Sequence, residues 1–409
     1  MKLLFIVLDG LGDRPIPEYG GMTPLEYADT PNMDKFASLG MNGLLHVIAP
    51  GVTPGSDTAH LALFGADPFE FYTGRGPFEA AGLGLDVKEG DVAFRTNFAT
   101  IDENCIIKDR RAGRIKNGTR ELAELFDGMK VDDIQILLKA GTEHRAALIL
   151  RGPGLSDQVS ENDPHVEGNK PYEFKPLDES ESAKKTASVL NKFAKRASSI
   201  LSEATINKDR EKNGLLPANY FLIRGAGKVP KLPNFEEEYC LETACVAGGG
   251  LYKGIARMLG MHIIEDERLT GGITTDLAAK FDVALDSLQN YDFIFVHVKG
   301  TDNFGHDGDV QGKTEFIKKV DKELARFLPD NYKEDLVVMI TGDHSSPCSF
   351  KDHSADPVPI LICSPDCRRD EVEKFGESYA VKGNLGHVLG KHIMGIALNE
   401  MRLVQKFGA

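Results

Sequence analysis

The chain has 409 residues, of which 41% are apolar and 27% are charged. That length exceeds one ordinary hydrophobic core, and the composition is typical of a folded globular protein, so we expect two domains and little disorder. The net charge of −14 argues against nonspecific binding to nucleic acid or to an anionic membrane, because both depend on clustered lysine and arginine.

The sequence also limits where the chain resides. It contains no run of about twenty apolar residues, so no membrane span is predicted. The N-terminal run LLFIVL is too short for the core of a signal peptide and has no small-residue cleavage site behind it. Six cysteines are too few for a dense disulfide framework. We therefore expect a cytoplasmic protein, while nothing in the sequence indicates its oligomeric state.

The first predicted strand is the apolar run at residues 3–8, and Asp9 follows it in the turn DGLGD. The next strong pattern, VTPGSDTAHLALFG at residues 52–65, predicts a helix with Thr53 as its N-cap and Pro54 as its first residue. Ser56 would then lie in the first turn, where free N–H groups and the helix dipole favour an anion. A serine in a first turn is also common without any chemistry, so this stretch alone leaves both interpretations open.

The pattern changes between residues 86 and 235. We predict strands in the alternating segments DVAFRTNFATI, EHRAALILRG and NYFLIRG, and a helix in SAKKTASVLNKFAKRASSILSEAT. The polar stretch at 161–182 and the segment KVPKLPNFEEEY are typical of connections. These elements predict a smaller α/β (α+β) domain at residues 86–235, inserted into a first domain that comprises residues 1–82 and 240–409.

Three further apolar runs follow, at residues 293–298, 336–340 and 358–363. Like the first run they are almost continuously hydrophobic, which is typical of strands that are covered on both faces of a parallel sheet. We therefore predict an α/β fold in which a mainly parallel sheet is flanked by helices. Near the C-terminus, GHVLGKHIMGIAL predicts an amphipathic helix whose two histidines, His387 and His392, we interpret as structural.

Acidic residues and glycines directly follow three of the four apolar runs. The turns are DGLGD, KGTDNFGHD and TGDH, and KDHSADP comes shortly after the last of them. Ligands of open parallel sheets bind outside the carboxyl ends of the strands, so we expect these distant turns to meet at one site. The side chains that they would contribute are Asp9, Asp302, His306, Asp343, His344 and His353.

Three aspartates and three histidines suit two divalent ions of the zinc or manganese kind, which accept mixed carboxylate and imidazole ligands. Two such ions carry four positive charges; three carboxylates offset three of them, and an ionised serine would offset the fourth. Ser56 is the best candidate for this nucleophile, because a metal ion can lower the pKa of a bound hydroxyl. Plainer roles in turns or helix caps stay open for Asp9, Asp302, His306 and Asp343.

A basic segment, IIKDRRAGRIKNGTR, lies inside this acidic chain. Guanidinium groups recognise carboxylate and phosphate through two parallel hydrogen bonds, so Arg110, Arg111 and Arg114 suit a small anion. No aromatic residues alternate with them, which argues against a nucleic-acid surface. A solvated basic loop is the alternative.

The order of the motifs resembles a known set of enzymes. VLDGLGD, TPGSDTAH, GTDNFGHDGD, TGDHSSP and KDHSADPVPIL follow one another as in the alkaline phosphatase superfamily. Together with GRGPFEAAG, FRTNFAT, DRRAGRI and HRAALILRG they resemble the cofactor-independent phosphoglycerate mutases, in the shorter archaeal-type branch, over essentially the whole chain. The resemblance implies an alkaline-phosphatase-like core, an inserted substrate-clamping domain and an enzyme of glycolysis or gluconeogenesis.

The resemblance further implies an isomerase that interconverts 3-phosphoglycerate and 2-phosphoglycerate through a phosphoserine, without a requirement for 2,3-bisphosphoglycerate. Ser56 would be the nucleophile. One ion would be held by Asp302, His306 and His353. The other would be held by Asp9, Asp343, His344 and the Ser56 oxygen. Manganese or zinc would be the usual occupant, with magnesium or cobalt as further possibilities.

By similarity, the arginines of the inserted domain would clamp the substrate: Arg110, Arg111, Arg114 and Arg224. His165 would move a proton on or off the glycerate hydroxyls, and Lys253 of GGGLYKGIAR would neutralise phosphoryl oxygens. The longer bacterial and plant enzymes carry different sequence around these substrate ligands, so the resemblance transfers most directly to the metal core.

Two alternatives stay open. A phosphopentomutase, phosphonate hydrolase or phosphomonoesterase of the same superfamily would use the same metal core, and only the inserted domain would distinguish it, since an arginine-rich clamp suits a compact anionic acid better than a sugar. A non-catalytic metal-binding protein would be expected to have lost the nucleophile or a ligand, whereas every such position here holds a competent residue.

Overall fold

The computed structural model describes residues 1–332 and 335–408. The chain forms two compact units, a core unit of Met1–Tyr72 and Leu232–Ala409 and an inserted unit of Thr73–Lys231. The sequence analysis placed these boundaries at 82–86 and 235–240, so the structure moves one helix, α5 (Gly76–Gly82), into the inserted unit. No helix in the described ranges is long and apolar enough to cross a membrane.

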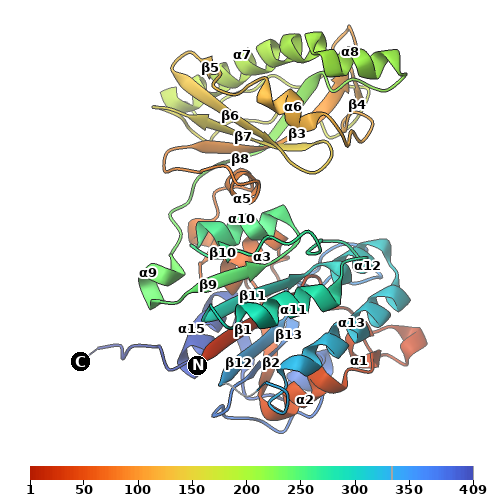
Figure 1. Ribbon diagram of the computed structural model, residues 1–409, viewed down its shortest axis with the longest axis vertical. Coiled ribbons are helices and arrows are strands. Elements are labelled where there is room, and N and C mark those ends of the chain that lie inside the picture. Colours follow the sequence, from red (N-terminus) through yellow and green to blue (C-terminus); the bar gives the residue numbers. More distant parts are fainter. Residues whose placement is uncertain (333–334, 409) are drawn as a thin grey trace. The chain divides into compact units, whose positions relative to one another are not determined.

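An eight-stranded sheet forms the centre of the core unit (Figure 1). Its strands, in spatial order, are β10 (His262–Ile263), β9 (Thr243–Val246), β11 (Phe293–Val298), β1 (Lys2–Leu8), β12 (Leu336–Thr341), β13 (Val358–Cys363), β2 (Met41–His46) and β14 (Gly386–Leu389). Every pairing is parallel except the two that β13 makes with β12 and β2. The four predicted strands and the α/β fold class with a mainly parallel sheet are confirmed.

The reversed direction of β13 explains why no acidic turn follows the fourth apolar run. Thr341 at the end of β12 lies opposite Ile360 near the start of β13, so the loop of residues 342–357 stays at the carboxyl edge of the parallel strands. The polar segment KDHSADP therefore precedes β13 and still reaches the same edge.

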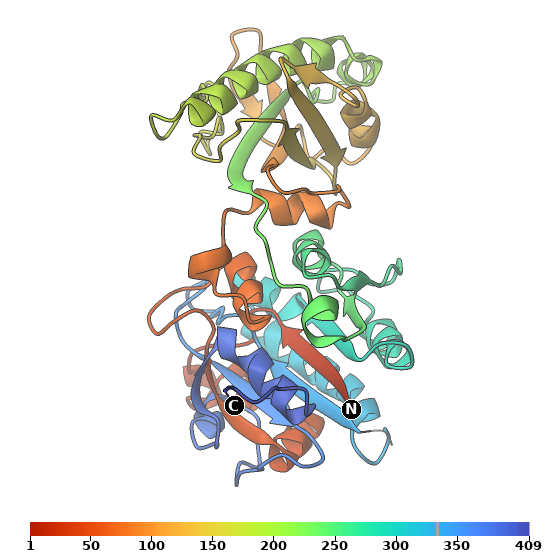
Figure 2. The same ribbon diagram turned by 90° about the vertical axis from the view of Figure 1, so that its left-hand side faces the viewer.

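Helices cover both faces of this sheet (Figures 1 and 2). On one face, α2 (Pro31–Leu39), α11 (Leu277–Ser287) and α13 (Val310–Leu324) share an apolar core with Leu4, Ile6 and Leu8 of β1. On the other face, Phe64 after helix α3 (Ser56–Leu63) packs edge-on against Phe5 and Phe295. Alternate side chains of β1 thus enter opposite layers, which is why its hydrophobic run is continuous.

The remaining helices of the core unit are mostly short. They are α1 (Pro24–Tyr27), α4 (Pro68–Phe71), α9 (Phe235–Tyr239), α10 (Gly250–Met258), α12 (Gly300–Asp307), α14 (Glu377–Ala380) and α15 (Gly390–Glu400), with 3₁₀ turns at Pro17–Tyr19 and Ala325–Phe327. The segment KVPKLPNFEEEY, which was predicted to be a connection, contains α9.

Two local predictions were wrong. Helix α3 begins at Ser56 with Gly55 as its N-cap, two residues later than predicted, because the Thr58 hydroxyl accepts the Gly55 N–H and closes the first turn there. Residues 386–398 do not form a single helix. His387 lies on β14, whose backbone pairs with β2, and α15 begins only at Gly390. Pairing with a strand distant in sequence overrides the local helical pattern.

The inserted unit is an antiparallel sheet with helices on both faces (Figure 2). Its strands are β3 (Val92–Ile101), β4 (Ile107–Asp109), β5 (Lys130–Val131), β6 (Ile134–Ala140), β7 (Arg145–Arg151) and β8 (Tyr220–Lys228). One face packs on α7 (Glu181–Glu203), accompanied by α6 (Thr119–Glu124) and α8 (Thr205–Lys212). On the other face, Ala80 of α5 packs on Ala93 and Ile149, which explains why α5 belongs to this unit. The three predicted strands and the long helix are confirmed.

A buried ion pair anchors α13 to the loops at the carboxyl edge of the core sheet. The side chains of Lys313 and Asp13 are fully buried, and Nζ of Lys313 lies 2.9 Å from Oδ2 of Asp13. The ammonium group also donates to the backbone oxygens of Gly12, at 3.1 Å, and Ser346, at 3.0 Å. One buried cation thus links the loop after β1 to the loop after β12.

We predict that Lys313→Met lowers the free energy of unfolding by about 3–5 kcal/mol, because it leaves the Asp13 carboxylate buried without its cation. Urea denaturation of the full chain measures this loss. The matched control is Lys318→Met on the same helix, whose ammonium pairs with Glu315 at the surface and should cost no more than about 0.5 kcal/mol. Equal losses for the two variants would contradict the prediction.

A second buried acid makes stability depend on pH. The carboxyl of Glu377 accepts hydrogen bonds from the Thr23 hydroxyl, at 2.8 Å, and the Asp13 N–H, at 3.1 Å. Burial nevertheless raises the pKa of Glu377 from 4.5 to about 7. Between these two values the folded chain holds the proton more tightly than the unfolded chain, so the free energy of unfolding falls as the pH rises.

We predict that Glu377→Gln removes this contribution, because glutamine has no proton to lose. The variant should be more stable than the parent protein at pH 8 and should lose less stability between about pH 4.5 and 7. Denaturation at a series of pH values measures the slope. The exposed neighbour Glu373 provides the control, since Glu373→Gln should keep the parental slope; a parental slope in Glu377→Gln would refute the assignment.

Candidate functional site

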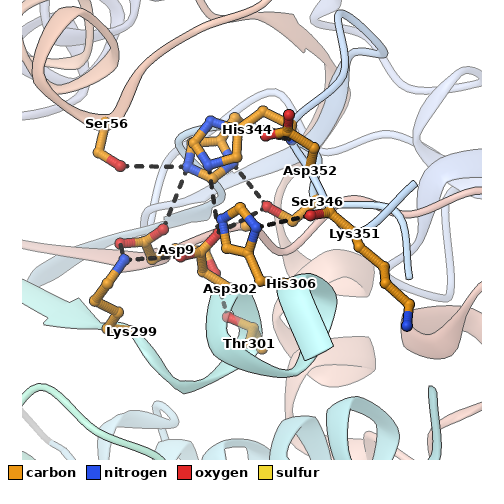
Figure 3. A network of polar contacts seen from close by, with 12 residues as sticks. Asp9, Ser56, Lys299, Thr301, Asp302, His306, His344, Ser346, Lys351 and Asp352 are labelled. Carbon is orange, nitrogen blue, oxygen red and sulfur yellow. Dashed lines mark hydrogen bonds and ion pairs between the residues drawn. The ribbon is translucent and has the colours of Figure 1, made fainter. Parts of the chain in front are cut away.

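The six predicted ligands converge at the carboxyl edge of the core sheet. Asp9 follows β1, Asp302 and His306 lie on α12 directly after β11, and the remaining ligands, Asp343, His344 and His353, come from the loop between β12 and β13. Figure 3 shows Asp9, Asp302, His306 and His344 turned toward one another. The three turns, which are distant in sequence, therefore meet at one edge of the sheet, as expected.

Gly10 allows this convergence. A Cβ atom at Gly10 would lie 2.8 Å from the backbone Cα of Asp302, and the residue has a φ of +66°. Only glycine tolerates both the close approach and this left-handed backbone. The glycine after Asp9 is thus explained by the proximity of α12.

Two groups of side chains could each hold a cation. The ligand atoms of Asp9, Asp343 and His344 lie within 4.8 Å of one another, and so do those of Asp302, His344 and His353. Nε2 of His306 lies 3.3 Å from Oδ1 of Asp302, beside the second group. The resemblance assigned His344 to one ion only, whereas in this arrangement its ring lies between the two groups.

Hydrogen bonds orient the histidine rings. Nδ1 of His353 bonds to the carbonyl oxygen of Pro54, at 2.9 Å, and Nδ1 of His306 to that of Lys351, at 3.0 Å. A carbonyl can only accept, so Nδ1 carries a proton in both rings, and Nε2 keeps a free lone pair in the neutral form of each ring. Such outer partners commonly fix the tautomer of metal-binding histidines.

The ring of His344 is fixed through Ser346. The Ser346 hydroxyl donates to Oδ1 of Asp302, at 2.8 Å, and its oxygen lies 3.1 Å from Nδ1 of His344 (Figure 3). Since the serine proton is directed to the carboxylate, the imidazole donates to the serine and its Nε2 is left unprotonated. In their neutral form, all three histidines thus turn a free Nε2 toward the aspartates.

The donor set fits divalent cations. Among the described residues, Oδ1 of Asp9 and Oδ2 of Asp343 are buried oxygens without a hydrogen-bond partner, and such orphaned charge is costly unless a cation balances it. Burial and the neighbouring Asp9 raise the pKa of Asp343 well above its usual range. Burial also opposes the ionisation of Asp9, but the charge of Lys299 and the neighbouring His297 hold the pKa of Asp9 well below its usual range.

Ser56 lies beside these groups at the start of α3. Its Oγ is 3.5 Å from Nε2 of His344 (Figure 3). Nε2 of His344 is in turn 3.3 Å from Oδ1 of Asp9 and 3.4 Å from Oδ2 of Asp343. The hydroxyl is thus close enough to share a cation with the buried aspartates.

Sequence reasoning missed three residues around Asp9. Nζ of Lys299 lies 3.0 Å from Asp9 and 2.8 Å from Asp302, so it joins one carboxylate of each group. The Tyr252 hydroxyl donates to Asp9, and Nε2 of His297 lies 3.1 Å from it. Lys299 could have been found, because it directly precedes the turn that carries Asp302. His297 is hidden inside an apolar strand, and Tyr252 lies on α10, far away in the sequence.

The predicted clamp residues fall into three places. Arg110 makes two hydrogen bonds to the buried Asp163, at 3.0 and 2.6 Å, and Arg224 also pairs with Asp163. His165 is exposed and pairs with Glu161 at 2.6 Å, while its Nδ1 lies 3.4 Å from Arg110.

The other predicted clamp residues lie apart from this carboxylate. Arg111 and Arg114 are exposed in the turn after β4. Lys253 belongs to the core unit, where it pairs with Glu265 at 2.8 Å. The structure thus gathers Arg110, Arg224 and His165 near Asp163 but not Lys253.

Comparisons with known proteins agree with the resemblance seen in the motifs. The model of a family described as 2,3-bisphosphoglycerate-independent phosphoglycerate mutase matches residues 37–207. Proteins of this name from Methanosphaera stadtmanae and Methanococcus aeolicus are each 50% identical to the chain, over 412 and 409 residues, and both chains are covered completely in each comparison.

Two solved structures share the fold along the whole chain. A protein from Pyrococcus horikoshii matches with a TM-score of 0.85 and 40% identity, covering 100% of this chain and 99% of that one. The cofactor-independent phosphoglycerate mutase from Thermoplasma acidophilum matches with a TM-score of 0.74 and 37% identity, covering 98% and 99%. Since relatives that are half identical match it from end to end, the chain belongs to the 2,3-bisphosphoglycerate-independent phosphoglycerate mutase family.

Proposed function

We propose that the protein interconverts 3-phosphoglycerate and 2-phosphoglycerate through a phosphorylated Ser56, as an isomerase of glycolysis or gluconeogenesis. One observation carries the proposal: the Ser56 hydroxyl lies 3.5 Å from Nε2 of His344. The His344 side chain belongs to both groups of aspartate and histidine residues that could hold a cation. The names of the relatives supply the substrate, and the independence of the relatives from 2,3-bisphosphoglycerate is expected here too.

The residues fit a site for two divalent ions, with Mn²⁺ or Zn²⁺ as the proposed occupants because the ligands mix carboxylate and imidazole. One ion would be held by Asp302, His306 and His353, and the other by Asp9, Asp343 and His344 with the Ser56 oxygen. Such ions, when bound, would neutralise charge on phosphoryl oxygens and favour the ionised form of the serine.

The chain's own groups then account for the transfer. The Ser56 oxygen forms a bond to phosphorus while the bond from phosphorus to the substrate oxygen breaks, and the glycerate later takes the phosphoryl group back on its other hydroxyl. Lys299 places a fixed positive charge beside Asp9 and Asp302, where negative charge gathers on the transferring oxygens. His344 holds its unprotonated Nε2 beside the serine hydroxyl.

The substrate must stay bound between the two transfers. We propose that Arg110, Arg111, Arg114 and Arg224 of the inserted unit hold the glycerate, that Lys253 neutralises phosphoryl oxygens, and that His165 moves a proton on or off the hydroxyls. Guanidinium groups suit a compact anionic acid. The cytoplasmic location expected from the sequence stays a prediction.

The function is tested by giving 3-phosphoglycerate to protein stripped of metal with a chelator, in the absence of 2,3-bisphosphoglycerate. We expect no activity until Mn²⁺, Zn²⁺ or Mg²⁺ is restored, and then formation of 2-phosphoglycerate with little free phosphate. Both products are measured in the same reaction. Release of phosphate alone would replace the mutase by a phosphomonoesterase, and full activity of the stripped protein would refute the metal site.

We predict that Ser56→Ala lowers the rate of interconversion at least about a thousandfold, since it deletes the nucleophile on which the other groups act. The variant should fold and should no longer incorporate labelled phosphate from substrate into protein. Ser38→Ala is the control and should remain active, because among the described residues the partly exposed Ser38 hydroxyl bonds only to the carbonyl of Lys35 in its own helix. A Ser56→Ala protein with near-normal activity would remove Ser56 from the mechanism.

A further inference from the structure

A fully buried histidine lies one helical turn after Ser56 on α3. The side chain of His60 is 0% exposed, and residues four apart on a helix lie on the same face. Nδ1 of His60 is 2.7 Å from the carbonyl oxygen of Ser56. A carbonyl can only accept, so Nδ1 donates this hydrogen bond. His60 belongs to neither of the two groups that could hold a cation.

The same nitrogen also lies close to a buried carboxylate. Nδ1 of His60 is 3.6 Å from Oδ2 of Asp343, an oxygen that has no hydrogen-bond partner among the described residues. This separation is too long for a hydrogen bond, so the N–H is directed to Ser56. One edge of the imidazole therefore adjoins both the backbone of Ser56 and a proposed cation ligand.

Three aromatic rings surround the His60 side chain. Its ring centroid is 4.8 Å from that of Tyr252, 5.2 Å from that of His297 and 5.8 Å from that of Phe295. Tyr252 in turn stacks on His297, with 3.5 Å between the ring centroids. Burial lowers the pKa of His60 to about 3, so the ring is neutral and its Nε2 carries no proton. We call His60, Tyr252 and His297 the ring cluster.

The ring cluster connects Ser56 to Asp9. At one end of the cluster the Tyr252 hydroxyl donates to Asp9, and Nε2 of His297 lies 3.1 Å from Oδ2 of Asp9. At the other end His60 bonds to the backbone of Ser56. Closely packed side chains transmit displacements to one another. The ring cluster therefore fixes how far the start of α3 lies from the carboxylate that follows β1.

The Ser56 hydroxyl itself is weakly held. Among the described residues, its only hydrogen bond is the 3.5 Å contact with His344. The position of the hydroxyl therefore depends on the backbone that carries it. Histidines hold this backbone at two carbonyl oxygens, since His353 bonds to that of Pro54 and His60 to that of Ser56.

We propose that His60 is a positioning residue for the nucleophile: its Nδ1–H holds the Ser56 carbonyl, and the ring cluster sets the distance from the Ser56 hydroxyl to Asp9 and Asp343. This inference rests on the proposed function. His60 is fully buried and does not reach the substrate, so it acts on the rate of phosphoryl transfer and not on substrate affinity. A misplacement of about 1 Å in a reacting group can cost about a hundredfold in rate.

Two substitutions separate the hydrogen bond from the packing of the side chain. His60→Leu nearly conserves the volume, removes the donor and also removes the unpartnered Nε2, so the variant should stay close to the parent protein in stability. His60→Asn keeps an amide N–H near the position of Nδ1 but leaves a cavity among the rings. Its unfolding temperature should fall by at least about 3 °C.

Activity should follow the opposite order to stability. In the mutase assay we expect kcat of His60→Leu to fall at least about thirtyfold, with KM for 3-phosphoglycerate changed by less than about threefold. The less stable His60→Asn should have a kcat at least about tenfold higher than that of His60→Leu, because it restores the donor. A role in packing alone would instead make activity follow stability.

Leu61→Ala is the matched control for lost packing. Leu61 is fully buried on the same helix, and its side chain can donate no hydrogen bond. The variant should have a lower unfolding temperature, as His60→Asn does, and a kcat within about twofold of the parent protein. Equal losses of kcat in His60→Leu and His60→Asn, or a loss through KM alone, would overturn the proposal.

A measurement that needs no catalysis distinguishes this proposal from the proposed function. In metal-free parent protein with isotope-labelled histidine nitrogens, the NMR signal that is absent from His60→Asn should show a protonated Nδ1 and an unprotonated Nε2. A proton on Nε2 instead would overturn the positioning role, even in an active mutase. The expected tautomer in a protein without mutase activity would keep the hydrogen bond to Ser56 and remove the proposed function.

Discussion

Buried negative charge at the carboxyl edge of the core sheet is the constraint on which the rest of the site depends. Asp9, Asp302 and Asp343 are each at most 3% exposed, and carboxylates in such a place repel one another unless cations balance them. Lys299 joins two of them, and the histidine rings turn unprotonated nitrogens toward the same space. Burying three carboxylates together costs the folded chain stability, which bound cations would restore.

The topology of the sheet brings these buried carboxylates together through short turns. β1 lies between β11 and β12, and all three are parallel, so the turns after them come together without any long loop. The reversal at β13 returns a fourth polar segment to the same edge. The buried Lys313 then ties the loops after β1 and β12 together, which links the stability of α13 to the geometry of the site.

Charge of the opposite sign is collected in the inserted unit. Its α7 face is an ordinary apolar core, whereas the middle of the other face is given to arginine and asparagine. Ala93 and Ala99 of β3 are buried in small apolar clusters on this face, whereas Arg95 and Asn97 between them bring polar atoms into the same layer.

The sequence by itself determined the strands of the core, the acidic turns behind them and the position of Ser56 in a first helical turn, because hydrophobic runs and the residues that end them are local signals. It did not reveal His297, which is concealed within FIFVHV, or Arg95, which is one residue of an alternating strand. Short strands such as β9 and β14 were also missed, since they depend on partners far away in the chain. Only the tertiary structure decided that His344 lies between both ligand groups and that Arg95 faces Arg224, because these neighbours are set by strand order and register, which no local pattern encodes.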